Sequence, residues 1–214
     1  MTLYAQWAIA TTGTENGYEW VDLGLPSGLK WATMNVGATT PEGYGIYYAW
    51  GETRGPKSTY DWSNYKWCKG SSYTQTKYCT DSDDGTVDNK TTLDLSDDAA
   101  NANWGGNWRM PTNEEQEELQ NTSYTTWTWT TLNGVYGYKV TSKTNGNSIF
   151  LPAAGVRSNY TLYSAGSVGS YWSSSLNNTN FSSKACCLYF DSVKVDSGDD
   201  SRFVGMSVRP VLAK

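Results

Sequence analysis

Short runs in which apolar and polar residues alternate recur along the chain, and each run predicts a β-strand. Residues 21–23 and 29–33 alternate in this way, and the Pro-Ser-Gly sequence at 26–28 between them is a turn signal. We therefore predict a β-hairpin near the start of the chain. A short aromatic stretch follows at 46–50, and the polar segment 51–92 has few aliphatic residues, which favours a long loop region.

The second half of the chain carries most of the strand signals. Between Trp127 and Pro152, the runs WTWTTL, VYGYKVTS and SIFLP are separated by Asn-Gly sequences at 133–134 and 145–146, which favour tight hairpin turns. This pattern predicts a three-stranded meander. Further candidate strands are 169–175, 185–191 and 205–211.

Two short helices are predicted between these regions. Ser96 stands before two Asp residues, an arrangement typical of an N-cap followed by acidic residues in the first turn. Thr112 and Glu115 have the spacing of a capping box and predict a helix that ends near Gln120. Helices in the first half and strands in the second half predict an α+β fold rather than an alternation of strands and helices.

The composition predicts one domain with a core built largely from aromatic side chains. The chain has 214 residues, of which 11 are Trp, 16 are Tyr and only 4 are Phe. Trp and Tyr bury a large flat body while keeping a polar group, so such a core needs few aliphatic residues. We expect Trp31, Trp50, Trp104 and Trp108 to lie in the core.

Charge and residue types exclude several classes of function. A net charge of −5 without a basic cluster argues against nucleic acid as a partner. No apolar run reaches the length of about 18 residues that a membrane-spanning helix needs, so no direct membrane insertion is expected. The chain contains no His, which removes Ser-His-Asp and Cys-His arrangements and makes a zinc site of the usual kind unexpected. We predict no catalytic residues, no cofactor and no metal.

Two features leave alternatives open. The acidic run 81–88 resembles a calcium loop, but its spacing departs from the EF-hand pattern, and a solvated acidic loop is the favoured interpretation. Cys68 and Cys79 flank a polar loop, and they form either a disulfide or two separate thiols. Cys186 and Cys187 are adjacent, so on a strand they face opposite sides.

Several motifs resemble a known family. The run GGNWRMPTNEEQEEL at 105–119 is similar to a segment of domains related to formylglycine-generating enzymes and C-type-lectin-like folds. The runs VDLGLPSGLKWATMNVGA, YYAWGET, LPAAGVR, YWSSS and RFVGMSVRPV resemble the Fibrobacter succinogenes major paralogous domain, which is common in gut Bacteroidetes. The resemblance covers about residues 18–212. It implies a C-type-lectin-like fold with short mixed strands, two short helices and long loops.

The activities of this superfamily are not implied. Cys186 and Cys187 do not recreate the reactive cysteine pair of the formylglycine-generating enzymes. The Glu-Pro-Asn and Trp-Asn-Asp signatures of calcium-dependent lectins are missing, so the resemblance points to a fold rather than to a reaction.

The start of the chain resembles a different module. The run MTLYAQW is similar to the last strand of a Listeria–Bacteroides repeat, a small module of bacterial surface proteins. We therefore interpret 1–10 as the tail of a preceding surface-repeat module, 11–17 as a linker and 18–214 as the C-type-lectin-like domain. We expect an extracellular or cell-surface location, as part of a larger exported protein.

A sharper resemblance is to the variable proteins of diversity-generating retroelements, which display variable side chains near the C-terminus. Mutating the first two bases of an Asn codon cannot produce Lys, Glu, Gln, Met or Trp. The stretch 177–204 contains only Lys184 and Lys194 from that set. An ordinary loop rich in Ser and Asn explains this composition nearly as well.

Strand alternation and this resemblance together select the candidate contact residues. Leu188 and Phe190 are expected to face the core, while Cys187, Tyr189 and Asp191 face outward. Tyr and Phe supply rigid contact area, and Asn and Ser supply adaptable hydrogen bonds. The candidate contact residues are Tyr163, Ser170, Asn177, Asn178, Asn180, Phe181, Ser183, Cys187, Tyr189, Asp191, Asp196, Asp199, Asp200, Phe203 and Val204.

The sequence thus favours a non-enzymatic receptor or adhesin domain that binds a protein or glycan on another cell or surface. One alternative is an enzyme of the formylglycine-generating or glycosidase type, marked by a deep metal-holding pocket or by a carboxylate pair with a raised pKa. The other is a structural spacer module of a surface protein, marked by the lack of an aromatic and polar patch. The identity of the ligand and the oligomeric state are left open.

Overall fold

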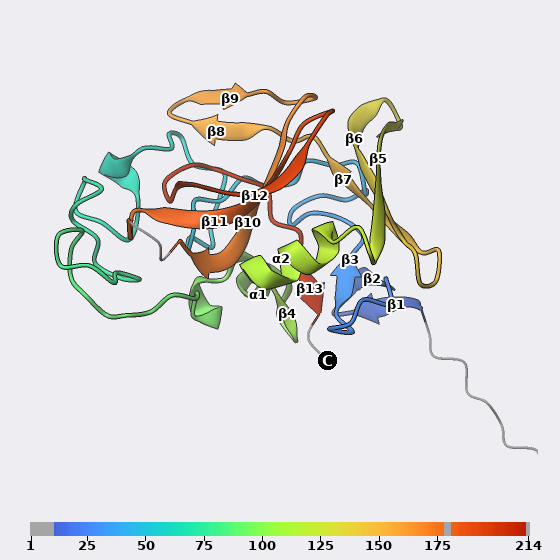
Figure 1. Ribbon diagram of the computed structural model, residues 1–214. Coiled ribbons are helices and arrows are strands. Elements are labelled where there is room, and N and C mark those ends of the chain that lie inside the picture. Colours follow the sequence, from blue (N-terminus) through green and yellow to red (C-terminus); the bar gives the residue numbers. More distant parts are fainter. Residues whose placement is uncertain (1–10, 178–180, 213–214) are drawn as a thin grey trace, which may run out of the picture.

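The protein is mostly β. The computed structural model describes residues 11–177 and 181–212, and the strands of this part gather in four sheets (Figure 1). Strands make up 38% and helices 10% of the structure, so the predicted α+β fold class of the C-type-lectin-like type is wrong. The physical reason is the size of the two helices, which have only 6 and 8 residues and form no layer of their own.

The largest sheet joins the beginning and the end of the described chain. Its strands lie in the order β1 (Thr12–Glu15), β2 (Tyr18–Asp22), β3 (Lys30–Ala32), β13 (Val211–Leu212) and β4 (Trp108–Arg109). Strands β2 and β3 are the predicted hairpin. The segment 11–17, which we interpreted as a linker, contributes β1 to this sheet, where Thr12 lies opposite Val21.

The predicted meander is confirmed. It consists of the antiparallel strands β5 (Thr125–Leu132), β6 (Val135–Ser142) and β7 (Ser148–Pro152). Asn133 and Gly134 have φ values of 48° and 84°, the left-handed conformation that the tight turn between β5 and β6 requires. A small hairpin of β8 (Val156–Ser158) and β9 (Thr161–Tyr163) follows.

A three-stranded sheet, which we call the third sheet, is formed by strands late in the chain. Its strands are β10 (Gly169–Leu176), β11 (Lys184–Phe190) and β12 (Val195–Ser201), all antiparallel. The first two match the predicted strands, whereas the polar strand β12 was not predicted. The segment 205–211, predicted as a strand, is instead mainly irregular and has only single bridges, such as that between Met206 and Tyr48, before β13 begins.

The two helices were placed correctly, but one cap was not. Helix α1 (Ala99–Trp104) is capped by Asp98, whose side chain accepts hydrogen bonds from the backbone N–H groups of Ala100 and Asn101. The predicted cap Ser96 lies instead in the preceding 3-10 turn η2 (Leu95–Asp97). Ser96 is wrong as a cap because the helix begins only after Asp98, whose carboxylate reaches the free N–H groups.

The second helix has the predicted capping box. Helix α2 (Asn113–Gln120) begins with the reciprocal bonds between Thr112 and Glu115. It packs against the third sheet, where the Nε2 group of Gln116 donates to the backbone oxygen of Tyr171 at 3.1 Å. Among the described residues, no helix is long and apolar enough to cross a membrane.

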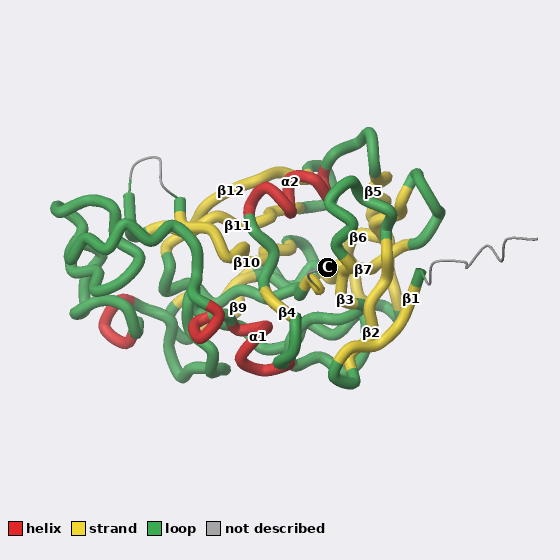
Figure 2. Tube along the Cα trace, turned by 90° about the horizontal axis from the view of Figure 1, so that it is seen from below, coloured by secondary structure: helices red, strands yellow, loops and turns green. Residues whose placement is uncertain are grey.

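The predicted loop region 51–92 forms one end of the molecule, where Figure 2 shows almost only loop with a single short helical turn, η1 (Trp62–Asn64). The guanidinium of Arg202, which is completely buried, donates to the hydroxyl of Tyr65 at 2.9 Å and to the backbone oxygen of Lys77 at 3.0 Å. The loop is therefore tied to the end of β12. Cys68 and Cys79 are separate thiols rather than a disulfide.

The predicted aromatic core is confirmed. Side chains of the four named Trp residues are at most 5% exposed, namely those of Trp31, Trp50, Trp104 and Trp108. Successive side chains of β10 and β11 belong to different core clusters on the two faces of their sheet. Trp172 and Cys187 pack in one cluster, and Tyr171 and Leu188 pack in the other.

Candidate functional site

Several of the candidate contact residues lie on one face of the third sheet. Ser170 on β10 lies opposite Tyr189 on β11, and Tyr189 in turn lies opposite Asp196 on β12. Residues that are directly opposite in antiparallel strands project to the same face. Cys187 lies opposite Gly198 in the same way, so these five residues share a face, which we call the pocket face.

A pocket of about 200 Å³ opens on the pocket face. Six of the candidate contact residues line it: Ser170, Cys187, Tyr189, Asp196, Asp199 and Asp200. The remaining lining residues are Lys194, Ser197, Gly198 and Met206, which the sequence did not single out. A glycine inside a strand is a sign of a hollow or of a close approach, and Gly198 was the signal that could have indicated the pocket.

Gly198 leaves enough space for a side chain, whereas Gly169 on β10 of the same sheet does not. A Cβ atom placed at Gly198 would meet only Cys187 Sγ at 3.8 Å and Tyr189 Cβ at 3.9 Å, both ordinary contact distances. At Gly169, by contrast, the ring of Phe190 already occupies the place of a side chain. The absence of a side chain at Gly198 therefore contributes to the hollow.

Two carboxylates, those of Asp196 and Asp200, project to the pocket face and are unequally paired, whereas Asp199 lies opposite Cys186 and projects to the other face. Lys194 Nζ lies 2.9 Å from Asp196, with both side chains more than half exposed, and Lys184 Nζ lies 2.6 Å from Asp199. Asp200 has no ion pair with any described residue, and its carboxylate accepts only the backbone N–H of Ser201. Burial raises the pKa of Asp200, because desolvation disfavours its charged form.

The floor of the pocket contains neutral polar and apolar groups. Ser170 is 3% exposed and lines the pocket. Burial raises the pKa of the Cys187 thiol and raises that of Cys186 to about 11, so both remain neutral thiols near neutral pH. Cys187 was predicted to face solvent. It is buried because its side chain packs in the core cluster that contains Trp172 and Met206.

The other candidate contact residues lie outside the pocket. Val204 is buried and Phe203 packs edge-on against Trp62, with ring centroids 4.9 Å apart, so neither is a free outward residue as predicted. Asp191 lies in the turn after β11, where its carboxylate accepts the backbone N–H groups of Val193 and Lys194.

A second group lies at the far end of β11. Asn177 donates from Nδ2 to Asp199 at 2.7 Å, Phe181 is 54% exposed and Ser183 is half-buried. Because β11 has 7 residues, its two ends are about 20 Å apart. The residues Asn178 and Asn180 lie outside the described residues.

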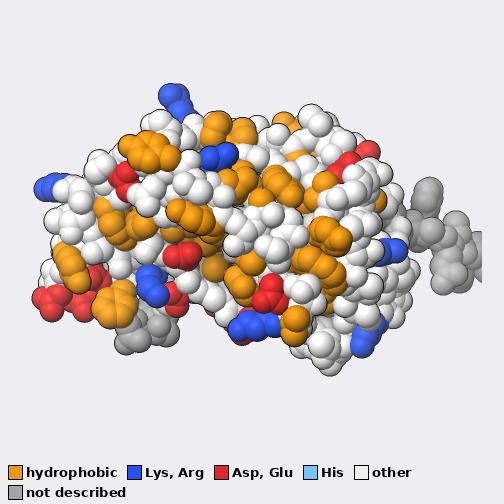
Figure 3. All heavy atoms as spheres, turned by 90° about the horizontal axis from the view of Figure 1, so that it is seen from above, with side chains coloured by type: hydrophobic (Ala, Val, Ile, Leu, Met, Phe, Trp, Pro, Cys, Tyr) orange, Lys and Arg blue, Asp and Glu red, His pale blue; other side chains and the backbone are white. Residues whose placement is uncertain are grey.

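Tyr163 lies on the separate hairpin of β8 and β9. Its side chain is 47% exposed, and that of Tyr160 in the adjoining turn is 78% exposed. Seen from the side of this hairpin, the surface carries scattered groups of hydrophobic side chains with charged side chains between and around them (Figure 3). The candidate contact residues are thus spread over the pocket, the two ends of β11 and the β8–β9 hairpin, and they do not form a single patch.

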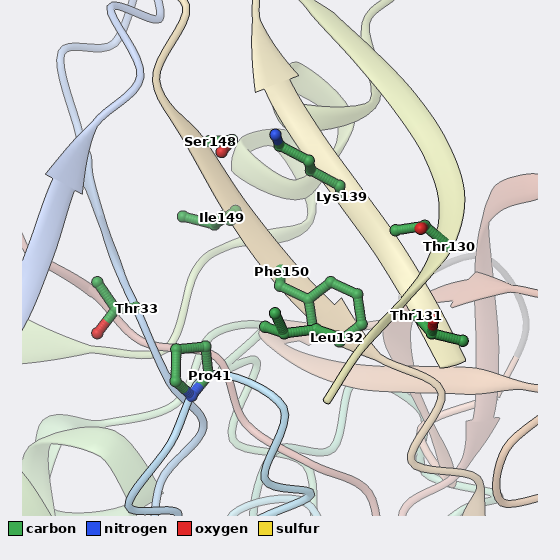
Figure 4. Close-up of a pocket in the computed structure, with 9 residues that line it drawn as sticks. All are labelled: Thr33, Pro41, Thr130, Thr131, Leu132, Lys139, Ser148, Ile149 and Phe150. Carbon is green, nitrogen blue, oxygen red and sulfur yellow. The ribbon is translucent and has the colours of Figure 1, made fainter. Parts of the chain in front are cut away.

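A larger cavity of about 390 Å³ lies away from the candidate contact residues, on the outer face of the meander (Figure 4). Leu132 and Phe150 lie together in it, Pro41 closes it from a loop, and Lys139 is its one charged lining residue. No local sequence pattern indicates this cavity, because its walls come from segments about 100 residues apart.

The acidic loop 81–88 serves the fold. Asp84 is buried and accepts the backbone N–H of Ser182 at 2.6 Å, and Asp88 accepts those of Tyr78 and Cys79. Within residues 11–177 and 181–212, no group of three or more Cys, Asp or Glu side chains is arranged to hold a metal ion. The acidic residues of this loop therefore satisfy backbone donors.

Comparison of the chain with protein-family models, with curated proteins and with solved structures finds no match.

Proposed function

We propose that the protein is a non-enzymatic ligand-binding domain of the receptor or adhesin type, which recognises a protein or glycan of another cell or surface through the pocket face. The observation that carries the proposal is the convergence of six candidate contact residues, from three strands, on one pocket. Such convergence is typical of a recognition site, where a few polar groups fix the ligand on a partly apolar floor. We place the domain at the cell surface, within a larger exported protein.

The chemistry of the pocket supports binding over catalysis. The neutral thiols of Cys186 and Cys187 face opposite sides of β11, which does not suit a reactive cysteine pair. Asp196 and Asp200 share a face but are four residues apart on β12, hence about 13 Å apart along the strand. The two carboxyl groups of a glycosidase are roughly 5 to 9.5 Å apart, so this pair suits neither glycosidase geometry.

Diversification by a retroelement is part of this proposal. Ser, Cys, Tyr and Asp can all arise from an Asn codon by changes in its first two bases, and these four residue types supply all six candidate contact residues of the pocket. Lys194 and Met206 cannot arise in this way and would be fixed scaffold positions. A near-copy of the corresponding coding segment beside a reverse-transcriptase gene, with Asn codons at the six positions, is the expected genomic arrangement.

The test is to fill the pocket. Gly198→Leu places a side chain in the hollow without requiring a left-handed backbone, because the φ of Gly198 is not positive. We expect wild-type protein to bind members of a surface-protein array or a glycan array, and Gly198→Leu to weaken that binding at least tenfold, or by about 1.4 kcal/mol. The matched control is Thr130→Leu, which fills the cavity on the meander instead.

Two results would count against the proposal. If Gly198→Leu keeps the wild-type binding pattern, recognition lies elsewhere on the surface. If the wild-type protein binds no member of either array but packs end to end in solution, the structural spacer is the better interpretation.

A further inference from the structure

We propose that the cavity on the outer face of the meander binds a small amphipathic carboxylate, whose unbranched apolar chain runs along the strands. This inference goes beyond the proposed function, because the cavity and the pocket face belong to different sheets. It is carried by three observations, which are the size of the cavity, the separation of its apolar end from its cationic end, and an ammonium group that the fold leaves unpaired.

The strand register shows which lining side chains face the cavity. Lys139 on β6 lies opposite Phe150 on β7, and positions two residues apart on a strand share a face. By this rule five lining side chains project to the outer face of the meander, namely those of Thr130, Leu132, Lys139, Ser148 and Phe150. The cavity volume of about 390 Å³ falls in the range of about 300–1,000 Å³ that is usual for small-molecule sites.

One end of the cavity is apolar. The side chain of Phe150 is 7% exposed, and its ring lies over Gly137, where an added Cβ atom would be only 2.8 Å from Phe150 Cζ. The ring is thereby directed toward Leu132, and Figure 4 shows these two side chains together, with Pro41 beside them. These three side chains form an apolar wall against which a hydrocarbon chain can pack.

The loop that carries Pro41 is fastened to the meander. Asn133, in the turn between β5 and β6, donates from Nδ2 to Glu42 Oε1 at 2.8 Å. This hydrogen bond holds Pro41 at the apolar end of the cavity and places a carboxylate near that end. Because like charges repel, an anionic group of a ligand is favoured at the opposite end.

The opposite end of the cavity is cationic. In Figure 4 the side chain of Lys139 points away from Leu132 and toward the side of Ser148, which is diagonal to Lys139 on the neighbouring strand. The ammonium of Lys139 makes neither an ion pair nor a hydrogen bond with any residue of 11–177 and 181–212. A carboxylate beside it would form a charge-assisted hydrogen bond, and the Ser148 hydroxyl can donate a second one.

The distance between the two ends requires an elongated ligand. Lys139 lies opposite Thr128, which is four residues before Leu132 on β5, so the two ends are about 13 Å apart along the strands. A single charged group cannot contact both ends, whereas a carboxylate with a chain of several carbons can. A neutral apolar ligand would leave Lys139 unused, and an amphipathic cation would bring a second positive charge beside it.

The direct test is a titration of the full chain with sodium hexanoate, followed by the backbone amide signals in NMR spectra. We expect saturable shifts of the signals of Thr130, Lys139 and Ser148. At matched ionic strength, n-hexanol and hexylammonium should bind about threefold more weakly or worse, because they lack the ion pair with Lys139. Acetate, which lacks the apolar chain, should bind more than about tenfold more weakly. The absence of saturable shifts with hexanoate, or equal affinity for any of the three control compounds, would overturn the inference.

Substitutions of Lys139 separate its charge from the rest of the cavity. Lys139→Gln should weaken hexanoate binding about threefold or more, to the level of n-hexanol, and Lys139→Arg should preserve the binding. The matched control is Lys143→Gln, since Lys143 lies outside the cavity and donates to the backbone oxygen of Thr122. Unchanged hexanoate affinity in Lys139→Gln, or an equal loss in Lys143→Gln, would contradict the assignment.

The failure of this inference can be told from the failure of the proposed function. Thr130→Leu should remove hexanoate binding and leave binding to the array ligands intact, whereas Gly198→Leu should have the opposite effects. Hexanoate binding that survives Thr130→Leu overturns the site on the meander alone. Array binding that survives Gly198→Leu overturns recognition by the pocket face alone.

Discussion

At the scale of single residues, two buried arginines hold segments that are far apart in the sequence. Arg209 is 2% exposed and donates to Asn35 Oδ1 at 2.8 Å and to the backbone oxygen of Phe150 at 2.9 Å, which joins the first sheet region to the meander. Arg202 joins the loop region 51–92 to the end of β12 in the same way. Each guanidinium satisfies several backbone oxygens that would otherwise be buried without a donor.

Replacing Arg202 by Met should therefore be severely destabilising. The change leaves the backbone oxygens of Lys77, Tyr78 and Ser182 without this donor, and each unsatisfied buried group costs about 1–3 kcal/mol. We expect the free energy of unfolding to fall by about 3 kcal/mol or more, measured by urea denaturation. Arg54→Met is the matched control, since Arg54 is exposed and should change stability by less than about 0.5 kcal/mol. Equal losses in the two variants would contradict the role of Arg202.

Single residues also show how much of the candidate site could be predicted from the sequence. Alternation along β11 correctly placed Leu188 and Phe190 in the core. It failed for Cys187 because a strand with core clusters on both faces has no outward side over part of its length. Ser170 was chosen by resemblance and is buried rather than exposed. Burial on both faces depends on tertiary packing, which alternation within one strand does not record.

At the scale of elements, helix α1 depends on one buried carboxylate. Asp98 is 2% exposed and accepts three backbone N–H groups, from Ala100, Asn101 and Met110. Burial nevertheless raises its pKa from 3.8 to about 6. Between about pH 4 and pH 6 the folded protein then binds more protons at this site than the unfolded chain does. The contribution of Asp98 to the free energy of unfolding must therefore fall as the pH rises through this window.

The variant Asp98→Asn tests this dependence, because the amide does not titrate. We expect the unfolding free energy of the wild type, minus that of Asp98→Asn, to decrease between pH 4 and pH 7 by up to roughly 3 kcal/mol, about 1.4 kcal/mol for each unit of the raised pKa. The measurement is urea denaturation of both proteins across this range. Parallel pH profiles would contradict the raised pKa of Asp98.

Local signals predicted the elements that depend on local chemistry. The Asn133-Gly134 turn and the capping box of Thr112 and Glu115 both rest on hydrogen bonds or φ values within a few residues, and both are confirmed. Strand β12, with the sequence VDSGDDS, was missed because Asp, Ser and Gly have low β-propensity. It pairs only with β11, and charged residues are common on such edge strands.

At the scale of the whole molecule, the fold is completed by its last described strand. The two residues of β13 lie between β3 and β4, so Val211 is opposite both Trp31 and Arg109 (Figure 1). The sequence could not predict this placement, because pairing between residues about 180 positions apart leaves no local pattern. The predicted fold class was wrong because the two helix signals, although both correct, do not indicate how small a part of the molecule the helices form.

This topology predicts that folding requires the end of the chain. A chain that ends at Pro210 lacks Val211 and Leu212, which are 0% and 7% exposed, and it leaves both β3 and β4 without their shared neighbour. Losing two buried aliphatic side chains and the hydrogen bonds on both sides of β13 should remove about 5 kcal/mol, comparable to the total stability of many domains. We expect loss of the near-ultraviolet circular dichroism of the buried Trp residues and rapid proteolysis. A chain that ends at Leu212 is the control and should keep both properties, whereas protease resistance in the chain that ends at Pro210 would show that the first sheet closes without β13.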